Sequence, residues 1–419
     1  MRTVVVSAMR LGSTAGALSF AIATWGITSS ATEGNPALPP ANQGTRNLGL
    51  DVVRALAISL VLVCHWSGAI SWWLGLHWPQ LVAVSGFFGV ELFFALSGFL
   101  IGTLLLELLE RDPSLRGWWR FMVRRWMRTL PLYGLCLAAM ALLWRPEGSL
   151  PAYLVQYGSL TQNLLWPMPK GDWFGVSWSL SVEEWFYLLF SACLIGSVAL
   201  TGRLTACTWG VIALFIIVPT ILRWEVPDSA EWDDHMRKVV ALRLDAITYG
   251  VAIAKLYRDR SLLMRWPALL LIAGLAIIVE QWFEPIPLSL LPVHVQRVFY
   301  LTSAPLAFSL CLPAALRVRR LPSAFAWLAR RLSAQAYPLY LVHLVLIDAV
   351  SMGHLRFGLS PVVCVVASGV LVFGVSHILH NWCEVPIMIR RPKQYSSPLN
   401  PSRQPPARVV QGEGVYAPK

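Results

Sequence analysis

Arg54-Ala-Leu-Ala-Ile-Ser-Leu-Val-Leu-Val-Cys-His65 is an apolar run with an ionisable residue at each end. Arg54 and His65 are about three helical turns apart, so on a helix they share a face and are separated by roughly 16 Å of rise. A second string, Trp178-Ser-Leu-Ser-Val-Glu-Glu-Trp-Phe-Tyr187, also places acidic residues in an apolar stretch. Because ionisable residues are costly in lipid, they usually mark a buried site or a polar path. The two strings therefore predict membrane helices that carry a functional site.

The composition of the whole chain is that of a membrane protein. Of its 419 residues, 56% are hydrophobic and 13% are charged, whereas about a quarter of the residues of a soluble domain are charged. The apolar residues also form runs long enough to cross a bilayer. We therefore expect an all-helical polytopic protein with about ten transmembrane helices. Their ranges are near 52–71, 87–109, 129–144, 178–199, 205–222, 242–257, 267–283, 298–316, 336–350 and 361–383, the third, sixth and ninth being short.

Basic residues are divided unequally between the connections of these helices. The connections near 110–128, 200–204, 255–266 and 317–335, with the tail after 384, hold 22 Lys and Arg residues, against 7 in the alternate connections. Since positive charge marks the cytoplasmic side, both termini are predicted to be cytoplasmic. This topology and the attraction of anionic lipid headgroups account for the net charge of +12. The bilayer is thus the expected partner, and the charge is no argument for nucleic acid.

Composition also divides the chain into three segments. Residues 48–390 are the predicted ten-helix membrane domain, and they leave no room for a soluble domain of normal size. Residues 1–47 are interpreted as a flexible N-terminal extension or as the product of a start codon placed too early, with a cleaved signal peptide as the alternative. Residues 391–419 are rich in Pro, Ser, Gln and Arg, a composition typical of a disordered tail, which is expected in the cytoplasm.

A set of short motifs follows in order along residues 48–390. It begins with the Arg-x10-His pair of Arg54 and His65. The later strings are Gly89-Val-Glu-Leu-Phe-Phe-Ala-Leu-Ser-Gly-Phe-Leu-Ile101, Arg124-Arg-Trp-Met-Arg-Thr-Leu-Pro131, Trp178 to Tyr187, Arg243-Leu-Asp245 with Gly250, Tyr337-Pro-Leu-Tyr-Leu-Val-His343 and Glu384-Val-Pro386. In this order and spacing the chain resembles the integral-membrane acyltransferase-3 family, bacterial acyl-CoA-dependent O-acyltransferases. It departs from the family pattern at Glu91, where Asp is more common, and at Trp185, where Gln is usual.

The resemblance implies an acyl transfer from acyl-CoA to a hydroxyl, with the family's catalytic histidine at His65. An imidazole can take a proton from a hydroxyl near neutral pH, as a general base must. The alternative for His65 is a structural histidine that is hydrogen-bonded between helices. A metal is not expected, because the seven cysteines form no Cys-x-x-Cys pair and no zinc motif such as His-Glu-x-x-His occurs.

Arginines near the start of the third helix are candidates for donor binding. Arg125 and Arg128 share a helix face, and arginine forks suit phosphate oxygens such as those of coenzyme A. The resemblance likewise places the donor's phosphates at this Arg-x-x-Arg pair, and ordinary positive-inside charge is the alternative. Arg54 stays protonated, so it is expected to bind an anionic group, to pair with a buried carboxylate, or to snorkel to the interface.

Carboxylates in the second and fourth helices are further candidates. Glu183 and Tyr187 are one turn apart, and a buried Glu183 could orient an imidazole or accept from a sugar hydroxyl. The alternative, a helix-start acid that faces water, fits Glu184 better. Glu91 shares a face with Gly98-x-x-x-Gly102, a spacing that allows close helix approach. Glu91 is therefore either part of the site or a packing residue paired to an arginine.

Four further polar residues and one tryptophan are expected to support the site. A structural hydrogen bond is expected for Ser97, because a hydroxyl nucleophile needs an adjacent base. Trp178 is interpreted as a sugar-stacking residue or as an interfacial belt residue, and Ser181 follows in the same string. Tyr340 and His343 share a face of the ninth helix, where they contact substrate or make a structural polar contact.

The acceptor is expected to be a sugar hydroxyl in an envelope or exported glycan, modified at the bacterial inner membrane. Acyl-CoA, most simply acetyl-CoA, is the expected co-substrate, and no permanently bound cofactor is expected. A small molecule such as a macrolide antibiotic is the alternative acceptor. A transporter or flippase is the alternative from another class, but transporters often show paired halves and no internal repeat is found.

Overall fold

The computed structural model describes residues 47–144, 146, 148–169, 173–283 and 291–392, and every regular element in these residues is a helix. The all-helical fold class is thus confirmed, whereas the expectations for residues 1–46 and 393–419 lie outside the described residues. The α-helices are α1 (Leu48–Leu74), α2 (Gln80–Ala83), α3 (Ser85–Arg111), α4 (Leu115–Leu143), α5 (Leu150–Gly158), α6 (Ser177–Thr201), α7 (Leu204–Trp224), α8 (Leu244–Arg258), α9 (Pro267–Phe283), α10 (Val293–Ala315), α11 (Ser323–Phe357), α12 (Pro361–Leu379) and α13 (Val385–Ile389). Shorter helical turns are η1 (Asp233–Arg237), η2 (Val240–Leu242), η3 (Leu262–Arg265) and η5 (His380–Glu384).

Eight helices of the described chain are long and apolar enough to cross a membrane. The third and ninth helices, expected to be short, are 29 and 35 residues long. By contrast, α8 has 15 residues and α9 has 17, which correspond to roughly 22 and 25 Å of rise, less than the ~30 Å hydrocarbon core. α8 can be shorter than the hydrocarbon core because α3, α7 and α10 enclose it. Its neighbouring helices rather than lipid therefore set its length.

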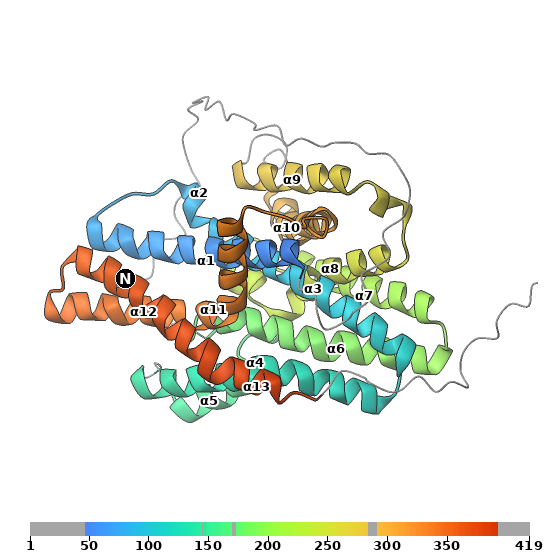
Figure 1. Ribbon diagram of the computed structural model, residues 1–419, viewed down its shortest axis with the longest axis horizontal. Helices are drawn as coiled ribbons and strands as arrows, with labels where there is room; N and C mark the ends of the chain where they lie inside the picture. Colours follow the sequence, from blue (N-terminus) through green and yellow to red (C-terminus); the bar gives the residue numbers. More distant parts are fainter. Residues whose placement is uncertain (1–46, 145, 147, 170–172, 284–290, 393–419) are drawn as a thin grey trace, which may run out of the picture. The chain divides into compact units, whose positions relative to one another are not determined.

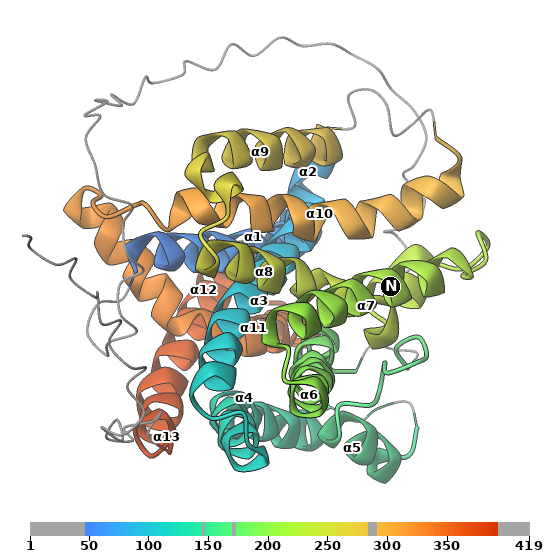
Figure 2. The same ribbon diagram turned by 90° about the vertical axis from the view of Figure 1, so that its right-hand side faces the viewer.

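The helices that position the site pack around α1 and α3. α1 packs on α3 and α11, and α4 packs on α6 and α11 (Figures 1 and 2). α3 and α8 touch almost backbone to backbone, because a Cβ at Gly98 would lie 1.9 Å from the carbonyl oxygen of Ile247, and one at Gly250 would lie 2.2 Å from that of Ala95. The close approach expected at Gly98 is therefore confirmed, and only glycine fits there.

Two buried ion pairs tie α3 and α7 to α8 and the turn that precedes it. The Nη1 and Nη2 atoms of Arg223 donate to the two carboxylate oxygens of Asp245, each at 2.7 Å, and Arg243 pairs with Glu91. All four side chains are 0% exposed. Because a buried charge is tolerated only when it is paired, the two pairs specify how these helices meet. Glu91 thus has the arginine partner that its packing alternative requires.

Candidate active site

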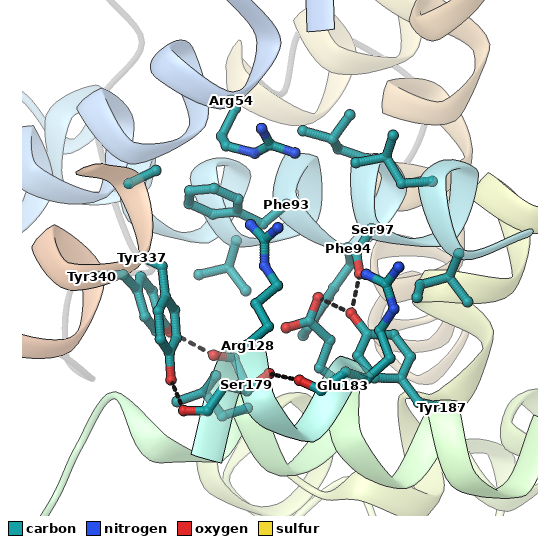
Figure 3. Close-up of a pocket in the computed structure, with 18 residues that line it drawn as sticks. Arg54, Phe93, Phe94, Ser97, Arg128, Ser179, Glu183, Tyr187, Tyr337 and Tyr340 are labelled. Atoms are coloured by element: carbon teal, nitrogen blue, oxygen red, sulfur yellow. Dashed lines mark hydrogen bonds between the residues drawn. The ribbon is translucent and has the colours of Figure 1, made fainter. Parts of the chain in front are cut away.

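A cavity of about 130 Å³ lies among α1, α3, α4, α6 and α11. Figure 3 shows the side chains that point into it, with Arg54 and Arg128 extending toward one another from α1 and α4. Helix formation alone places these residues on separate elements, and packing brings them together. The lining includes most of the site residues expected from the sequence, namely Arg54, Ser97, Arg125, Arg128, Glu183, Tyr187 and Tyr340.

A hydrogen-bonded chain of three side chains runs along one wall of the cavity. The Tyr187 hydroxyl donates to Glu183 Oε1 at 2.6 Å, and Ser97 Oγ lies 2.5 Å from the same hydroxyl. Since the single Tyr187 hydrogen is directed to the carboxylate, Ser97 is the donor to Tyr187. The structural hydrogen bond expected for Ser97 is present, and it leaves one oxygen of Glu183 facing the cavity.

Arginines predominate among the charged side chains of the cavity lining. Three of them line it, together with one carboxylate, that of Glu183. Arg54 donates to Ser333 Oγ at 3.3 Å, and Ser333 in turn donates to Asp51 at 2.7 Å. In the described part of the chain the buried Nε of Arg125 has no hydrogen-bond partner. A multiply charged anion would satisfy such donors by bidentate hydrogen bonding.

His65 and His343 form a second cluster beside this cavity. His343 Nδ1 lies 3.0 and 2.8 Å from the carbonyl oxygens of Leu339 and Tyr340. His343 Nε2 lies 3.2 Å from His65 Nδ1, which is also 2.9 Å from the carbonyl oxygen of Val61.

These contacts decide which nitrogen of each ring carries the proton. Carbonyl oxygens only accept, so Nδ1 of His343 carries its hydrogen and its Nε2 is an acceptor. His65 Nδ1 then faces two acceptors and must be the donor. A neutral His65 is consequently left with a lone pair on Nε2, which is the form a general base requires.

The histidine pair adjoins the cavity without lining it. Tyr340 lines the cavity and donates to or accepts from Ser179 at 2.6 Å, and its ring centroid is 5.9 Å from that of His343. His65, in contrast, is not part of the cavity wall. Although Arg54 and His65 share a helix face, they thus reach different parts of the site.

The connection between α7 and α8 supplies a cation that sequence reasoning missed. The Arg237 guanidinium carbon lies 4.6 Å from the centroid of the Trp178 ring, and the charges of Arg237 and Lys238 act on His65. Burial works to raise the pKa of Asp233, but Arg237 and Lys238 outweigh it and the pKa is lowered. The i,i+4 spacing of Asp233 and Arg237 predicts an ion pair within this turn. It does not predict that the turn lies near His65.

Three sequence-based assignments look different in three dimensions. Glu184, expected to face water, is only 5% exposed and lies beside Thr129 and Arg125, because the start of α6 is covered by α4. Trp178 is 4% exposed, so it is not a belt residue. Ser181 accepts from the buried Gln162 at 2.7 Å and does not line the cavity.

No group of three or more His, Cys, Asp or Glu residues that could hold a metal occurs in the described residues. The other sequence-predicted residues that the cavity lacks are Glu91, which pairs with Arg243, and Trp178.

Comparison with known proteins gives a family match. The model of the family described as acyltransferase domain matches residues 47–380. No solved structure matches the chain.

Three curated relatives match a shorter segment. The peptidoglycan O-acetyltransferase OatA of Listeria monocytogenes is 30% identical over 164 residues, which cover 35% of this chain and 24% of the relative. The O-acetyltransferase OatA of Staphylococcus aureus is 30% identical, with 34% and 24% covered, and the putative peptidoglycan O-acetyltransferase YrhL of Bacillus subtilis is 31% identical, with 35% and 23% covered. The chain thus spans about a quarter of the length of the curated relatives it matches.

Proposed function

The chain belongs to the acyltransferase-3 family, and from this premise we propose that it is a membrane O-acyltransferase. It moves an acyl group, most simply acetyl, from acyl-CoA to a hydroxyl of a sugar in an envelope or exported glycan. The observation that carries this proposal is the hydrogen-bonded histidine pair, which leaves the Nε2 lone pair of His65 available beside an arginine-lined cavity. The names of the Listeria and Bacillus relatives support a glycan as the acceptor.

In the proposed reaction the acceptor hydroxyl gives its proton to His65 Nε2 while its oxygen attacks the thioester carbonyl. The carbon–sulfur bond breaks, the new ester remains on the acceptor, and the coenzyme A thiolate leaves. The proton on His65 then passes to that thiolate, so that both free enzyme and thiol are regenerated. His343 accepts from His65 Nδ1 throughout, and this contact keeps the reactive nitrogen oriented.

Donor binding is assigned to the arginines of the cavity. Arg125 and Arg128 lie in the first half of α4, at the end of the helix that is expected in the cytoplasm, where acyl-CoA is made. Arg54 reaches the same cavity from α1. Their forks are suited to the diphosphate of the donor, and the thioester arm would extend from there toward Tyr340 and the histidine pair.

Arg125→Ala and Arg128→Ala are expected to raise the KM for acyl-CoA more than they lower kcat. The reason is that a lost phosphate contact acts similarly on the ground state and the transition state. Steady-state kinetics of the purified full-length protein measure this split, with the exposed Arg116→Ala on the same helix as the matched control. Unchanged KM in both variants would return these arginines to ordinary positive-inside charge, and lysine replacements should restore the KM only in part.

We further propose a multi-pass inner-membrane protein with both termini in the cytoplasm and ten spans, namely the eight long helices together with the shorter α8 and α9. The motivation is the division of basic residues, 22 against 7. Reporter fusions after residues 120, 165, 325 and 410 are expected to read cytoplasmic, external, cytoplasmic and cytoplasmic. An external reading at 120 would place Arg125 and Arg128 on the wrong side for coenzyme A and would contradict the donor assignment as well.

The acceptor is best identified in a deletion strain. Mass spectrometry of its envelope glycans should show the loss of one acyl group per modified unit, restored by the wild-type gene. If the glycans are unchanged and a secreted small molecule loses the acyl group instead, the acceptor is of the macrolide type. If membranes from an overproducing strain transfer no acyl group from acyl-CoA, the proposed activity is wrong.

A further inference from the structure

The last described residues of the chain lie against the first half of α4, close to the arginines of the cavity. α13 packs on α4, and Arg124 donates a hydrogen bond to the carbonyl oxygen of Pro392. Figures 1 and 2 both show α13 beside α4. Arg391 is thereby brought near Arg124 and Arg128, although the chain positions are far apart.

Three guanidinium groups, those of Arg124, Arg128 and Arg391, gather where α13 packs on α4. Burial lowers the pKa of Arg391 to about 10, and the charges of Arg124 and Arg128 act in the same direction. Among the described residues, neither Arg128 nor Arg391 forms an ion pair with a carboxylate. The acid whose charge acts on Arg391 is Glu384, and its Oε2 already lies 2.7 Å from His380 Nδ1. A gathering of guanidinium groups with so little compensating acid favours a multiply charged anion.

The order of the arginines along α4 matches the order of charges along coenzyme A. Arg124 precedes Arg128 by one helical turn. It therefore lies about 6 Å farther from the cavity along the helix. In acyl-CoA the thioester is at one end of the pantetheine arm, the diphosphate follows, and the ribose with its 3′-phosphate is at the far end. With the diphosphate at Arg125 and Arg128, the 3′-phosphate falls at the outer pair, Arg124 and Arg391.

We propose that Arg391, together with Arg124, forms a subsite for the ribose 3′-phosphate of the acyl-CoA donor. This inference rests on the proposed function of the cavity. Arg391 lies beyond residues 47–380, the segment that matches the family, and in the part of the chain where the sequence predicts only a disordered tail. The segment after the last long helix is thus part of the donor site.

The test compares two donors, acetyl-CoA and acetyl-dephospho-CoA, which lacks only the 3′-phosphate. Wild-type full-length protein should show a KM about tenfold higher for the dephospho donor, as expected for a lost hydrogen bond to a charged group. Arg391→Ala should raise the KM for acetyl-CoA by a similar factor and leave the KM for the dephospho donor unchanged. The matched control is Arg390→Ala, which removes the neighbouring exposed arginine and should change neither value.

Arg391→Lys keeps the charge without the fork and should retain part of the discrimination between the two donors. An equal rise in KM for both donors would overturn the proposal, as would unchanged KM for acetyl-CoA. Lipid headgroups are another source of phosphate, so the same assays are run in nanodiscs of zwitterionic lipid and in nanodiscs of anionic lipid. If Arg391→Ala changes the KM only in anionic lipid, Arg391 binds headgroups and the proposed subsite is wrong. Wild-type protein that neither binds nor uses either donor would instead refute the proposed function itself.

Discussion

His65→Ala should abolish acyl transfer, lowering turnover by about 10²–10⁴-fold, the usual effect of removing a general base. The hydrogen bonds of His65 explain why it is suited to act as the base. The carbonyl oxygens of Leu339 and Tyr340 orient His343, and His343 Nε2 together with the Val61 carbonyl holds the proton of His65 on Nδ1. The other titratable side chain next to it on α1, Cys64, is directed to the carbonyl oxygen of Ala83 at 3.0 Å.

The measurement requires a folded protein, so His65→Ala and His65→Gln are compared with wild type by size exclusion, thermal melting and acyl-CoA binding. His343→Gln serves as a companion variant, because it perturbs the orientation of His65 without removing the base. Its turnover should fall less than that of His65→Ala. A folded His65 variant that binds acyl-CoA and keeps more than about a tenth of wild-type turnover would place the base elsewhere, first at Glu183 and then at His343.

Arg243→Ala should destabilise the protein by about 3–5 kcal/mol, because it leaves the Glu91 carboxylate buried without its partner. Both side chains are 0% exposed, and Arg243 also donates to the carbonyl oxygen of Leu301 at 3.0 Å. Thermal melting in detergent and the amount of protein in the membrane measure the effect. A double variant, Glu91→Leu with Arg243→Met, removes both charges and should recover most of the stability.

The double variant also separates the two interpretations of Glu91. If it is stable and retains wild-type turnover, Glu91 acts through packing alone. If it is stable but inactive, Glu91 has a direct role in the site. Melting of Arg243→Ala at the wild-type temperature would contradict the prediction.

Some site residues could be identified from the sequence because a charged side chain in an apolar helix is unusual in itself. Arg54, Arg125, Arg128 and Glu183 are charged residues in apolar helices, and helical spacing places Tyr187 one turn from Glu183. All five line the cavity. Spacing cannot show which of two adjacent acids is covered by another helix, so Glu184 was expected in water although it is buried.

Residues that act through partners distant in the chain could not be predicted in this way. No periodicity indicates that His343 meets His65, that Arg237 faces Trp178, or that Arg391 returns to α4. Each depends on a contact between helices formed by segments far apart in the chain. The length of α8 likewise depends on contacts with other helices, because its neighbours rather than a bilayer surround it.

The sequence by itself therefore determined the helical class, the membrane character and the identities of most ionisable site residues, since these follow from hydrophobicity and from helix periodicity within one segment. Tertiary structure alone decided which nitrogen of His65 is free, which arginine neutralises Glu91 and which side chains share the cavity. The physical reason is that hydrogen bonds and ion pairs act over a few ångströms. Their partners are selected by how the helices pack, and packing depends on surfaces from several segments at once.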